Sequence, residues 1–204
     1  MSKNLKLVVF IIIMGTITSV LLQGTYTLTK DRIAENADIK LKSAVLDGFD
    51  IAYTTSNIHD VFDSEVTIIN HTDDVNGSFT FYVDDQTGAI AFEYAGGGVW
   101  DEISGVLTLE SDLVTIQKIA VLAQAETPGL GAIVATEDYL ANFVGIKMTP
   151  QLEINKDDAA NKENEVDTIT GATRTSKAFE DMLNLTYTTA MDIWESESYG
   201  GSNS

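Results

Sequence analysis

The sequence predicts an α+β protein with one N-terminal transmembrane helix followed by one mixed α/β domain. Two observations carry this prediction. The residues from Leu7 to Thr29 include no charge, and the later residues change between strand-like and helix-like periodicities. The length of 204 residues suits one domain with an appendage. We therefore expect an anchor over residues 1–29, a helical neck over 30–48, the domain over 49–198 and a disordered tail over 199–204.

The uncharged N-terminal run is long enough to cross a hydrocarbon core of roughly 30 Å. A cleaved signal peptide is the alternative, but no A-x-A-like site follows the apolar residues. We therefore expect an uncleaved anchor in contact with membrane lipid. Lys3 and Lys6 favour a cytoplasmic N-terminus, whereas Lys30 and Arg32 flank the other end. Charge counting alone leaves the orientation open.

Charge and cysteine content exclude several classes of function. The chain has 12 basic and 31 acidic residues; since Lys3 and Lys6 precede the run, 10 basic and 31 acidic residues follow it, a net charge of −21. Such a surface repels phosphate backbones, so we expect no nucleic-acid partner. The absence of cysteine excludes disulfides, thiolate metal sites and cysteine-ligated clusters. Two histidines cannot build a histidine-rich metal site, and we expect no metal.

The elements after the anchor follow from local patterns. Apolar residues at helical spacing predict a helix from about Lys30 to Leu46. Two β-rich runs around "DDQTG" predict a hairpin over residues 78–98. We also expect strands in "VTIIN", "EISGVLTLES", "LVTIQKIAVLA" and "FVGIKM", and a short helix in "TEDYLANF". Beyond Ser176, one apolar helical face comprises Phe179, Met182, Leu183, Tyr187, Met191 and Trp194.

Two glycine-containing loops are candidates for a binding site. "YAGGGVW" combines three glycines with a flat amphipathic ring at Trp100; the alternative is a flexible turn that ends in a core tryptophan. "AETPGLGAIV" combines the turn signal Pro128-Gly129 with the acceptor Glu126 and the hydroxyl of Thr127. Without a partner motif, the residues of the second loop favour a solvated turn between strand and helix.

A third loop, "DTITGATRTSKAF", directly precedes a predicted helix. Gly171 permits a tight turn, and Thr175 or Ser176 can cap a helix that starts near Lys177. A helix N-terminus offers free N–H groups and a positive dipole end, which suit a phosphate. The spacing of a Walker loop is absent. On these grounds the segment is a capped turn with some affinity for anions.

These three loops resemble motifs of the FMN-binding domain family. "DTITGAT" is similar to its flavinylation motif D-x-x-[ST]-G-A-T, "ETPGLG" to a second hallmark and "GGGVW" to a glycine-rich segment. The resemblance implies that the last threonine, Thr173, is joined to the 5′-phosphate of FMN through a phosphoester bond. It further implies that a flavin transferase recognises Asp167, Thr170, Gly171 and Ala172.

The remaining candidate cofactor residues are extensions of the same resemblance. We expect the apolar wall of the ring to comprise Trp100, Leu130 and the backbone of Gly96, Gly97 and Gly98, and we expect Gly129 to shape the turn. Glu126 and Thr127 are expected to hydrogen-bond the polar edge of the ring or the ribityl chain, and Lys177 to assist the phosphate. We expect no residue of this chain to act as an independent catalyst.

Two kinds of relative share these motifs: the G subunit of the Rnf ferredoxin:NAD ion-translocating oxidoreductase, and the C subunit of the sodium-translocating NADH:quinone reductase, Nqr. The short chain favours Rnf, while "GGGVW" leans toward Nqr. Either resemblance implies a single-pass protein of the cytoplasmic membrane, with its C-terminal domain outside and the other components of the complex as partners. A non-redox anchored ectodomain and a stand-alone flavin carrier are the alternatives; the first would be colourless when purified.

Overall fold

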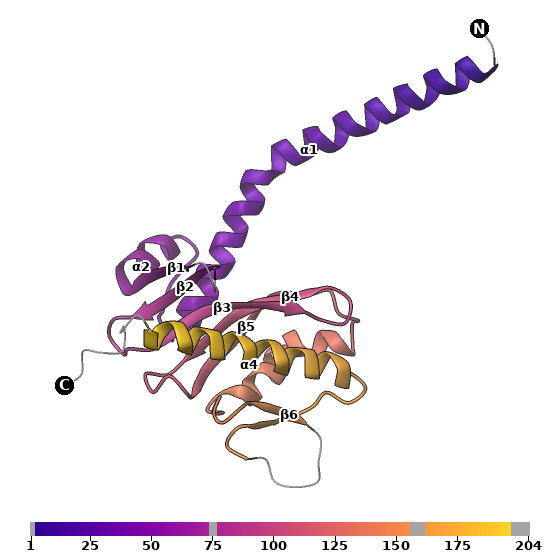
Figure 1. Cartoon of the computed structure of the whole chain (residues 1–204). Helices are drawn as coiled ribbons and strands as arrows, with labels where there is room; N and C mark the ends of the chain where they lie inside the picture. Colours follow the sequence, from indigo (N-terminus) through magenta and orange to yellow (C-terminus); the bar gives the residue numbers. More distant parts are fainter. Residues whose placement is uncertain (1–2, 74–76, 156–161, 197–204) are drawn as a thin grey trace. The chain divides into compact units, whose positions relative to one another are not determined.

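The computed structural model describes residues 3–73, 77–155 and 162–196. The chain divides into two compact units, residues 1–40 and residues 41–204. The helix α1 (Lys3–Gly48) begins in the first unit and ends in the second (Figure 1). It therefore crosses the expected boundary between anchor and neck without a break. The expected tail over residues 199–204 lies outside the described residues.

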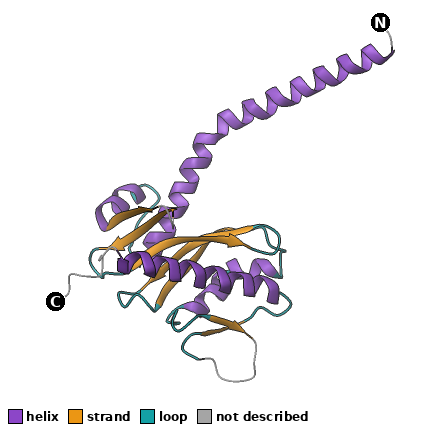
Figure 2. Cartoon of the chain, viewed as in Figure 1, coloured by secondary structure: helices purple, strands orange, loops and turns teal. Residues whose placement is uncertain are grey.

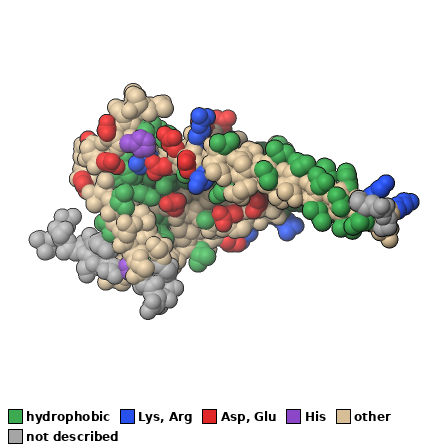
Figure 3. Space-filling model, turned by 90° about the horizontal axis from the view of Figure 1, so that it is seen from above, with side chains coloured by type: hydrophobic (Ala, Val, Ile, Leu, Met, Phe, Trp, Pro, Cys, Tyr) green, Lys and Arg blue, Asp and Glu red, His purple; other side chains and the backbone are tan. Residues whose placement is uncertain are grey.

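The first unit is an apolar helix whose side chains are open to the surroundings. α1 is long and apolar enough to cross a membrane, and none of its most apolar window is buried within the protein. Hydrophobic side chains follow one another along it in Figure 3. The hydroxyls of Thr16, Thr18 and Thr25 each donate to the carbonyl four residues earlier, at 2.8–2.9 Å. These polar groups are therefore satisfied within the helix, as a hydrocarbon environment requires.

The second unit is built on a five-stranded antiparallel sheet in the order β1-β2-β3-β4-β5 (Figure 2). Each strand pairs with the next one along the chain, and the predicted hairpin between β2 and β3 is confirmed. The five predicted strand-rich segments up to Ala123 all form this sheet. Its strands are β1 (Val66–Asp73), β2 (Gly77–Asp84), β3 (Ile90–Gly97), β4 (Glu102–Leu109) and β5 (Ile116–Ala123).

The helix α4 (Thr173–Ser196) covers one face of the sheet. Phe179 packs edge-on against Tyr94 of β3 with ring centroids 5.9 Å apart, and Trp194 packs against Phe81 of β2 at 5.0 Å. The predicted apolar face is confirmed, since Met182 and Leu183 are also buried and Tyr187 and Met191 are partly buried. This packing fixes the N-terminal end of α4 beside the ends of β3 and β4.

The opposite face of the sheet is covered by the end of α1 and by α2 (Ile58–Glu65), which the sequence did not predict. Val45 and Leu46 are fully buried, and Phe62 of α2 lies edge-on to Tyr82 of β2 with centroids 5.9 Å apart. Lys118 of β5 donates to the carbonyl of Asp47 at 3.1 Å. The last turns of the expected neck therefore belong to the core of the domain.

Short elements complete the second unit. The predicted helix in "TEDYLANF" is present as α3 (Glu137–Leu140) and the 3-10 turn η2 (Ala141–Phe143), preceded by η1 (Gly131–Ala135). The predicted strand in "FVGIKM" is wrong. Gly145 has φ +80°, which breaks an extended backbone, and within this segment Lys147 forms only an isolated bridge with Thr115. Two short strands, β6 (Glu153–Asn155) and β7 (Glu165–Asp167), form a parallel pair.

Candidate functional site

The three candidate loops converge on one pocket of about 320 Å³ at the start of α4. This volume lies at the lower end of the roughly 300–1,000 Å³ range typical of small-molecule sites. Segments that lie far apart in the sequence meet there because β3 ends, β4 begins, β5 ends and α4 begins beside the pocket. The lining residues are Val99, Trp100, Glu126, Thr127, Leu130, Gly131, Gly171, Ala172, Thr173, Arg174 and Thr175.

The segment from Thr168 to Ala172, between β7 and α4, forms a tight turn. Gly171 has φ +83°, a conformation that a side-chain-bearing residue rarely adopts. The backbone N–H of Ile169 donates to the hydroxyl oxygen of Ser176 at 3.2 Å, which ties the turn to the first turn of the helix. Thr173 is exposed and is the first residue of α4. Its hydroxyl therefore belongs to the pocket and is free of the core.

The predicted helix start is wrong by four residues. α4 begins at Thr173, so Thr175 and Ser176 lie within its first turn and neither caps a helix that starts near Lys177. The reason is that both hydroxyls are used elsewhere: Ser176 binds the turn, and Thr175 binds Glu126. The first N–H groups of an α-helix have no acceptor inside the helix and lie at its positive dipole end. The pocket thus contains a seat suited to a phosphate.

Glu126 joins the "GGGVW" loop, called the glycine loop below, to α4. Its side chain is only 5% exposed, and its two carboxylate oxygens accept three hydrogen bonds from uncharged donors. Oε1 accepts from the backbone N–H of Val99 at 2.7 Å and of Trp100 at 3.1 Å; Oε2 accepts from the hydroxyl of Thr175 at 2.9 Å. The carboxylate is thereby occupied by the protein itself. This finding differs from the expected role of hydrogen-bonding a cofactor.

Two glycines make room for this carboxylate. A Cβ atom built on Gly98 would lie 2.5 Å from Glu126 Oε1, and one built on Gly131 would lie 2.5 Å from Oε2. Both separations are shorter than real Cβ contacts allow. Glycine at these positions is therefore required by the close approach of Glu126, and the two loop motifs are linked through one side chain.

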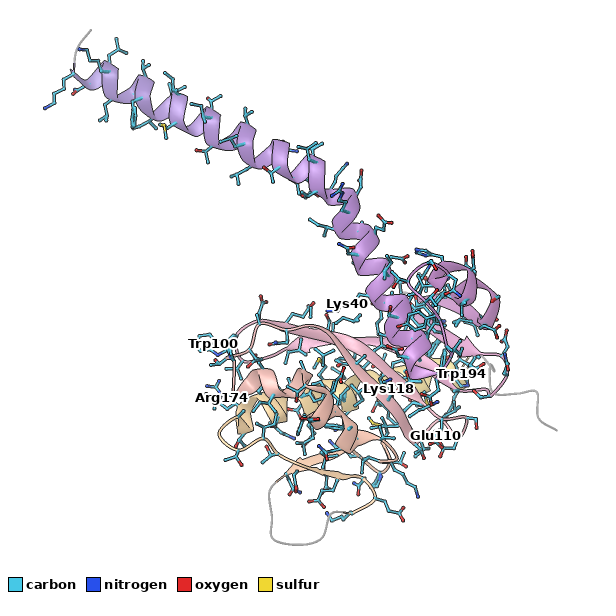
Figure 4. The ribbon with its side chains drawn as sticks, turned by 180° about the vertical axis from the view of Figure 1, so that it is seen from behind. Lys40, Trp100, Glu110, Lys118, Arg174 and Trp194 are labelled. Carbon is cyan, nitrogen blue, oxygen red and sulfur yellow. The ribbon has the colours of Figure 1, made fainter. Side chains whose placement is uncertain are left out.

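Two large apolar side chains stand open at the pocket. Trp100 is 72% exposed and Leu130 is 45% exposed, and both line the pocket. Figure 4 shows Trp100 and Arg174 at the same end of the domain, and both line the pocket. Exposed apolar surface beside a polar seat is typical of a site for a flat, amphipathic ligand.

Not every predicted residue lines the pocket. Of the thirteen candidates, Trp100, Glu126, Thr127, Leu130, Gly171, Ala172 and Thr173 do. Lys177, expected to assist a phosphate, instead forms ion pairs with Glu180 and with Asp181, the latter at 3.0 Å. The other candidates that are not part of the lining are Gly97, Gly98, Gly129, Asp167 and Thr170.

Asp167 lines a second hollow, of about 470 Å³, on the other side of the turn. The hydroxyl of Tyr139 donates to the Asp167 carbonyl at 3.2 Å. Burial raises the pKa of Tyr139 to about 12, so this hydroxyl stays protonated at neutral pH and remains a donor. Asp167 is exposed to solvent.

Four lining residues were missed by sequence reasoning: Val99, Gly131, Arg174 and Thr175. Three of them directly adjoin or lie inside a motif, so extending each motif by its neighbours would have included them. Thr175 had been interpreted as a cap, and nothing in the local pattern indicates that it binds Glu126.

Part of the sequence matches a known protein family, and the match includes the pocket. Residues 98–188 match the family described as the FMN-binding domain, and this segment contains every residue that lines the pocket. This segment of the chain is therefore similar to an FMN-binding domain. Its family match begins at the glycine that contacts Glu126 and ends within α4, so it covers the whole lining of the pocket.

Two groups of known proteins are similar to this chain. The C subunit of the Na(+)-translocating NADH-quinone reductase of Haemophilus ducreyi is 34% identical over 100 residues, which is 47% of this chain but only 39% of that protein. The chain therefore spans well under half of the length of this relative. The G subunit of the ion-translocating oxidoreductase complex of Methanosarcina acetivorans is 26% identical over 182 residues, covering 87% of this chain and 89% of that protein.

Two solved structures support the fold of this chain. NqrC of Shewanella oneidensis superposes with a TM-score of 0.65 at 18% identity, over 76% of this chain and 93% of that one. The C subunit of the Na(+)-translocating NADH-quinone reductase from Parabacteroides distasonis gives 0.62 at 23% identity, over 77% and 91%. The predicted fold class, an apolar N-terminal helix followed by a mixed α/β domain, is confirmed.

Proposed function

We propose that this protein is a membrane-anchored electron carrier with FMN joined covalently to Thr173, and that it serves as the G subunit of an Rnf-type ferredoxin:NAD ion-translocating oxidoreductase. The observation that carries the proposal is the position of Thr173. Its exposed hydroxyl stands at the N-terminus of α4, inside the pocket where the three loops of the FMN-binding domain meet. An acceptor for a phosphoester must be accessible in this way.

The residues of the pocket suit the parts of FMN. The open side chains of Trp100 and Leu130 would flank the isoalloxazine ring, and the first turn of α4 would face the phosphate. Glu126 holds the loop that carries Trp100 in place. When bound, FMN supplies the one- and two-electron chemistry that this cysteine-free chain lacks. The protein's contribution is placement and electrostatics.

Attachment forms the bond between Thr173 Oγ1 and the phosphorus of the flavin nucleotide. The hydroxyl proton leaves, and the bond from phosphorus to the leaving group of an activated flavin nucleotide breaks. We assign this step to a separate flavin transferase, because the pocket presents no general base beside Thr173: Glu126, the acidic lining residue, is held by three donors. Asp167, Thr170, Gly171 and Ala172 would form the turn that the transferase recognises.

The assignment to an Rnf-type complex rests on the extent of similarity. The Methanosarcina relative aligns along 89% of its length, whereas the Haemophilus relative aligns along 39%. The higher identity to the Haemophilus protein keeps an Nqr-type complex as the second candidate. In either case α1 would hold the domain on the outer side of the cytoplasmic membrane, in contact with lipid and with the other components of the complex. A covalent link would prevent loss of the flavin there.

The acidic surface is consistent with a low-potential carrier. Figure 3 shows acidic side chains spread over one face of the domain. Negative charge near a flavin disfavours its reduced, anionic form, although salt screens the effect beyond about 8 Å.

An intact mass of the membrane-expressed full chain tests the cofactor and its linkage together. We expect an addition equal to FMN less water, retained after denaturation. A mass equal to the bare polypeptide, from colourless folded protein, would exclude the proposal and favour a non-redox ectodomain. Co-purifying membrane proteins of the complex would distinguish this assignment from a stand-alone carrier.

A further inference from the structure

Arg174 differs from every other described cation of the domain in having no partner. Residues 41–204 contain six described lysines and arginines: Lys42, Lys118, Lys147, Lys162, Arg174 and Lys177. The five lysines bind His59, the Asp47 carbonyl, Glu163, Glu153 and Glu180 respectively. Within the part of the chain that the structure describes, the guanidinium of Arg174 makes no hydrogen bond or ion pair.

An unpaired arginine is unexpected on so acidic a surface. Residues after the anchor carry 31 acidic side chains against 10 basic ones, so carboxylates are abundant as partners. Arg174 is nevertheless exposed, lies directly after Thr173 and lines the pocket (Figure 4). Its five N–H donors are therefore available to a ligand that enters there.

The charge balance of the pocket indicates which ligand group these donors would take. Glu126 and Arg174 are the charged residues of the lining, one of each sign. Glu126 is buried and its oxygens already accept three hydrogen bonds. A phosphate ester on Thr173 would bring a second negative charge into this pocket. Arg174 would neutralise it with the paired N–H geometry that matches phosphate oxygens.

We propose that Arg174 is the phosphate-binding residue of this pocket and that it makes the site select a phosphorylated flavin over one without phosphate. The inference rests on the proposed function. The helix dipole and the free N–H groups at the start of α4 act on the same phosphate but are part of the backbone. Arg174 is the side chain that distinguishes this pocket from an ordinary helix N-terminus, and it replaces Lys177 in the predicted role.

The test separates binding from attachment. The full chain with Thr173→Val, in detergent, has no acceptor hydroxyl, so its equilibrium binding of FMN and of riboflavin can be measured by flavin fluorescence quenching. We expect FMN to bind at least about tenfold more tightly than riboflavin. Adding Arg174→Gln should weaken FMN binding by roughly tenfold to a hundredfold, the range for a charge-assisted hydrogen-bonded group, and leave riboflavin binding unchanged.

Two further variants control for charge and geometry. Lys147→Gln removes the same charge from an exposed pair with Glu163 and should leave the preference for FMN unchanged. Arg174→Lys keeps the charge but loses the paired donors and should restore part of the preference. An unchanged preference in Arg174→Gln, or an equal loss in Lys147→Gln, would overturn the assignment.

The remaining outcomes separate this inference from the proposed function. If the wild-type chain carries covalent FMN while the Thr173→Val chain does not prefer FMN over riboflavin, the role of Arg174 is refuted and the proposed function stands. If the wild-type chain carries no FMN and the Thr173→Val chain binds neither flavin, both are refuted.

Discussion

The carboxylate of Glu126 accepts a hydrogen bond from the hydroxyl of Thr175 at 2.9 Å, although 49 residues separate them in the chain. Both side chains are buried, at 5% and 4% exposure. The same carboxylate also accepts hydrogen bonds from the backbone N–H groups of Val99 and Trp100. The buried side chain of Glu126 therefore holds together its own "ETPGLG" loop, the "GGGVW" loop and the start of α4.

Removing this carboxylate should destabilise the domain more than neutralising it. Glu126→Ala leaves the N–H groups of Val99 and Trp100 and the hydroxyl of Thr175 without an acceptor, so we expect a loss of about 3 kcal/mol in the free energy of unfolding. Glu126→Gln keeps an oxygen for the backbone donors and should cost about 1 kcal/mol. Urea unfolding of the full chain in detergent, followed by circular dichroism, measures both. Equal losses would contradict the expected role of the amide oxygen, and no loss in either variant would show that the three hydrogen bonds carry no stability.

Thr175→Val should show whether this bond is coupled to the glycine loop. The substitution keeps the shape of the side chain and removes the hydroxyl donor, so we expect a loss of about 1–2 kcal/mol. Combined with Glu126→Gln, the loss should be smaller than the sum of the two single losses, because both remove the same interaction. Additive losses would contradict the direct contact.

Thr173→Ala should abolish covalent flavin while the domain remains folded. The side chain is exposed at the first residue of α4, so the substitution should change stability by no more than about 0.5 kcal/mol. The measurement is in-gel flavin fluorescence after denaturing electrophoresis, with circular dichroism as the control for folding. Retained fluorescence would move the attachment to another residue.

Adjacent glycines provide a matched test of the loop. A Cβ atom on Gly98 would lie 2.5 Å from Glu126 Oε1, whereas one on Gly97 would have no other atom within 4 Å. Gly98→Ala should therefore displace the carboxylate, cost about 1–3 kcal/mol and slow electron transfer through the assembled complex. Gly97→Ala should match the parent protein in both. Similar behaviour of the two variants would show that the close approach of Glu126 is unimportant.

The anchor is tested by the mature N-terminus and by extraction. We expect the chain to remain in the membrane fraction after alkaline carbonate treatment, because the uncharged part of α1 is long and apolar enough to span the bilayer. N-terminal sequencing should find no cleavage near Gln23. A mature chain that starts after this residue and is released as a soluble protein would identify the segment as a signal peptide.

Local patterns predicted much of the fold. The uncharged run, the alternating strands and the apolar face from Phe179 to Trp194 are each encoded within one continuous segment, and all three are present in the structure. Three short elements, α2, β6 and β7, were missed for the opposite reason. α2 has eight residues, and β6 and β7 have three each, which is too short for periodicity to distinguish them from loops.

The site shows the same division. The three motifs indicated which loops would meet, but not which atoms would hold them together. The sequence shows that Glu126 has acceptor oxygens. It does not show that these oxygens accept from Val99, Trp100 and Thr175, because those contacts depend on the packing of α4 on the sheet. The start of α4 was placed too late because Thr175 and Ser176 are both acceptable capping residues. The local pattern does not reveal that their hydroxyls instead bind Glu126 and Ile169, respectively.

The order of the elements along the chain has a consequence for biogenesis. All five strands of the sheet and both glycine loops precede α4, so a ribosome completes them before it reaches Thr173. A nascent domain at that stage has the two walls of the pocket but neither the acceptor hydroxyl nor Arg174. Flavin could therefore be attached to Thr173 only after the whole sheet has been synthesised. A yellow domain would report that synthesis has passed the sheet and the turn before α4.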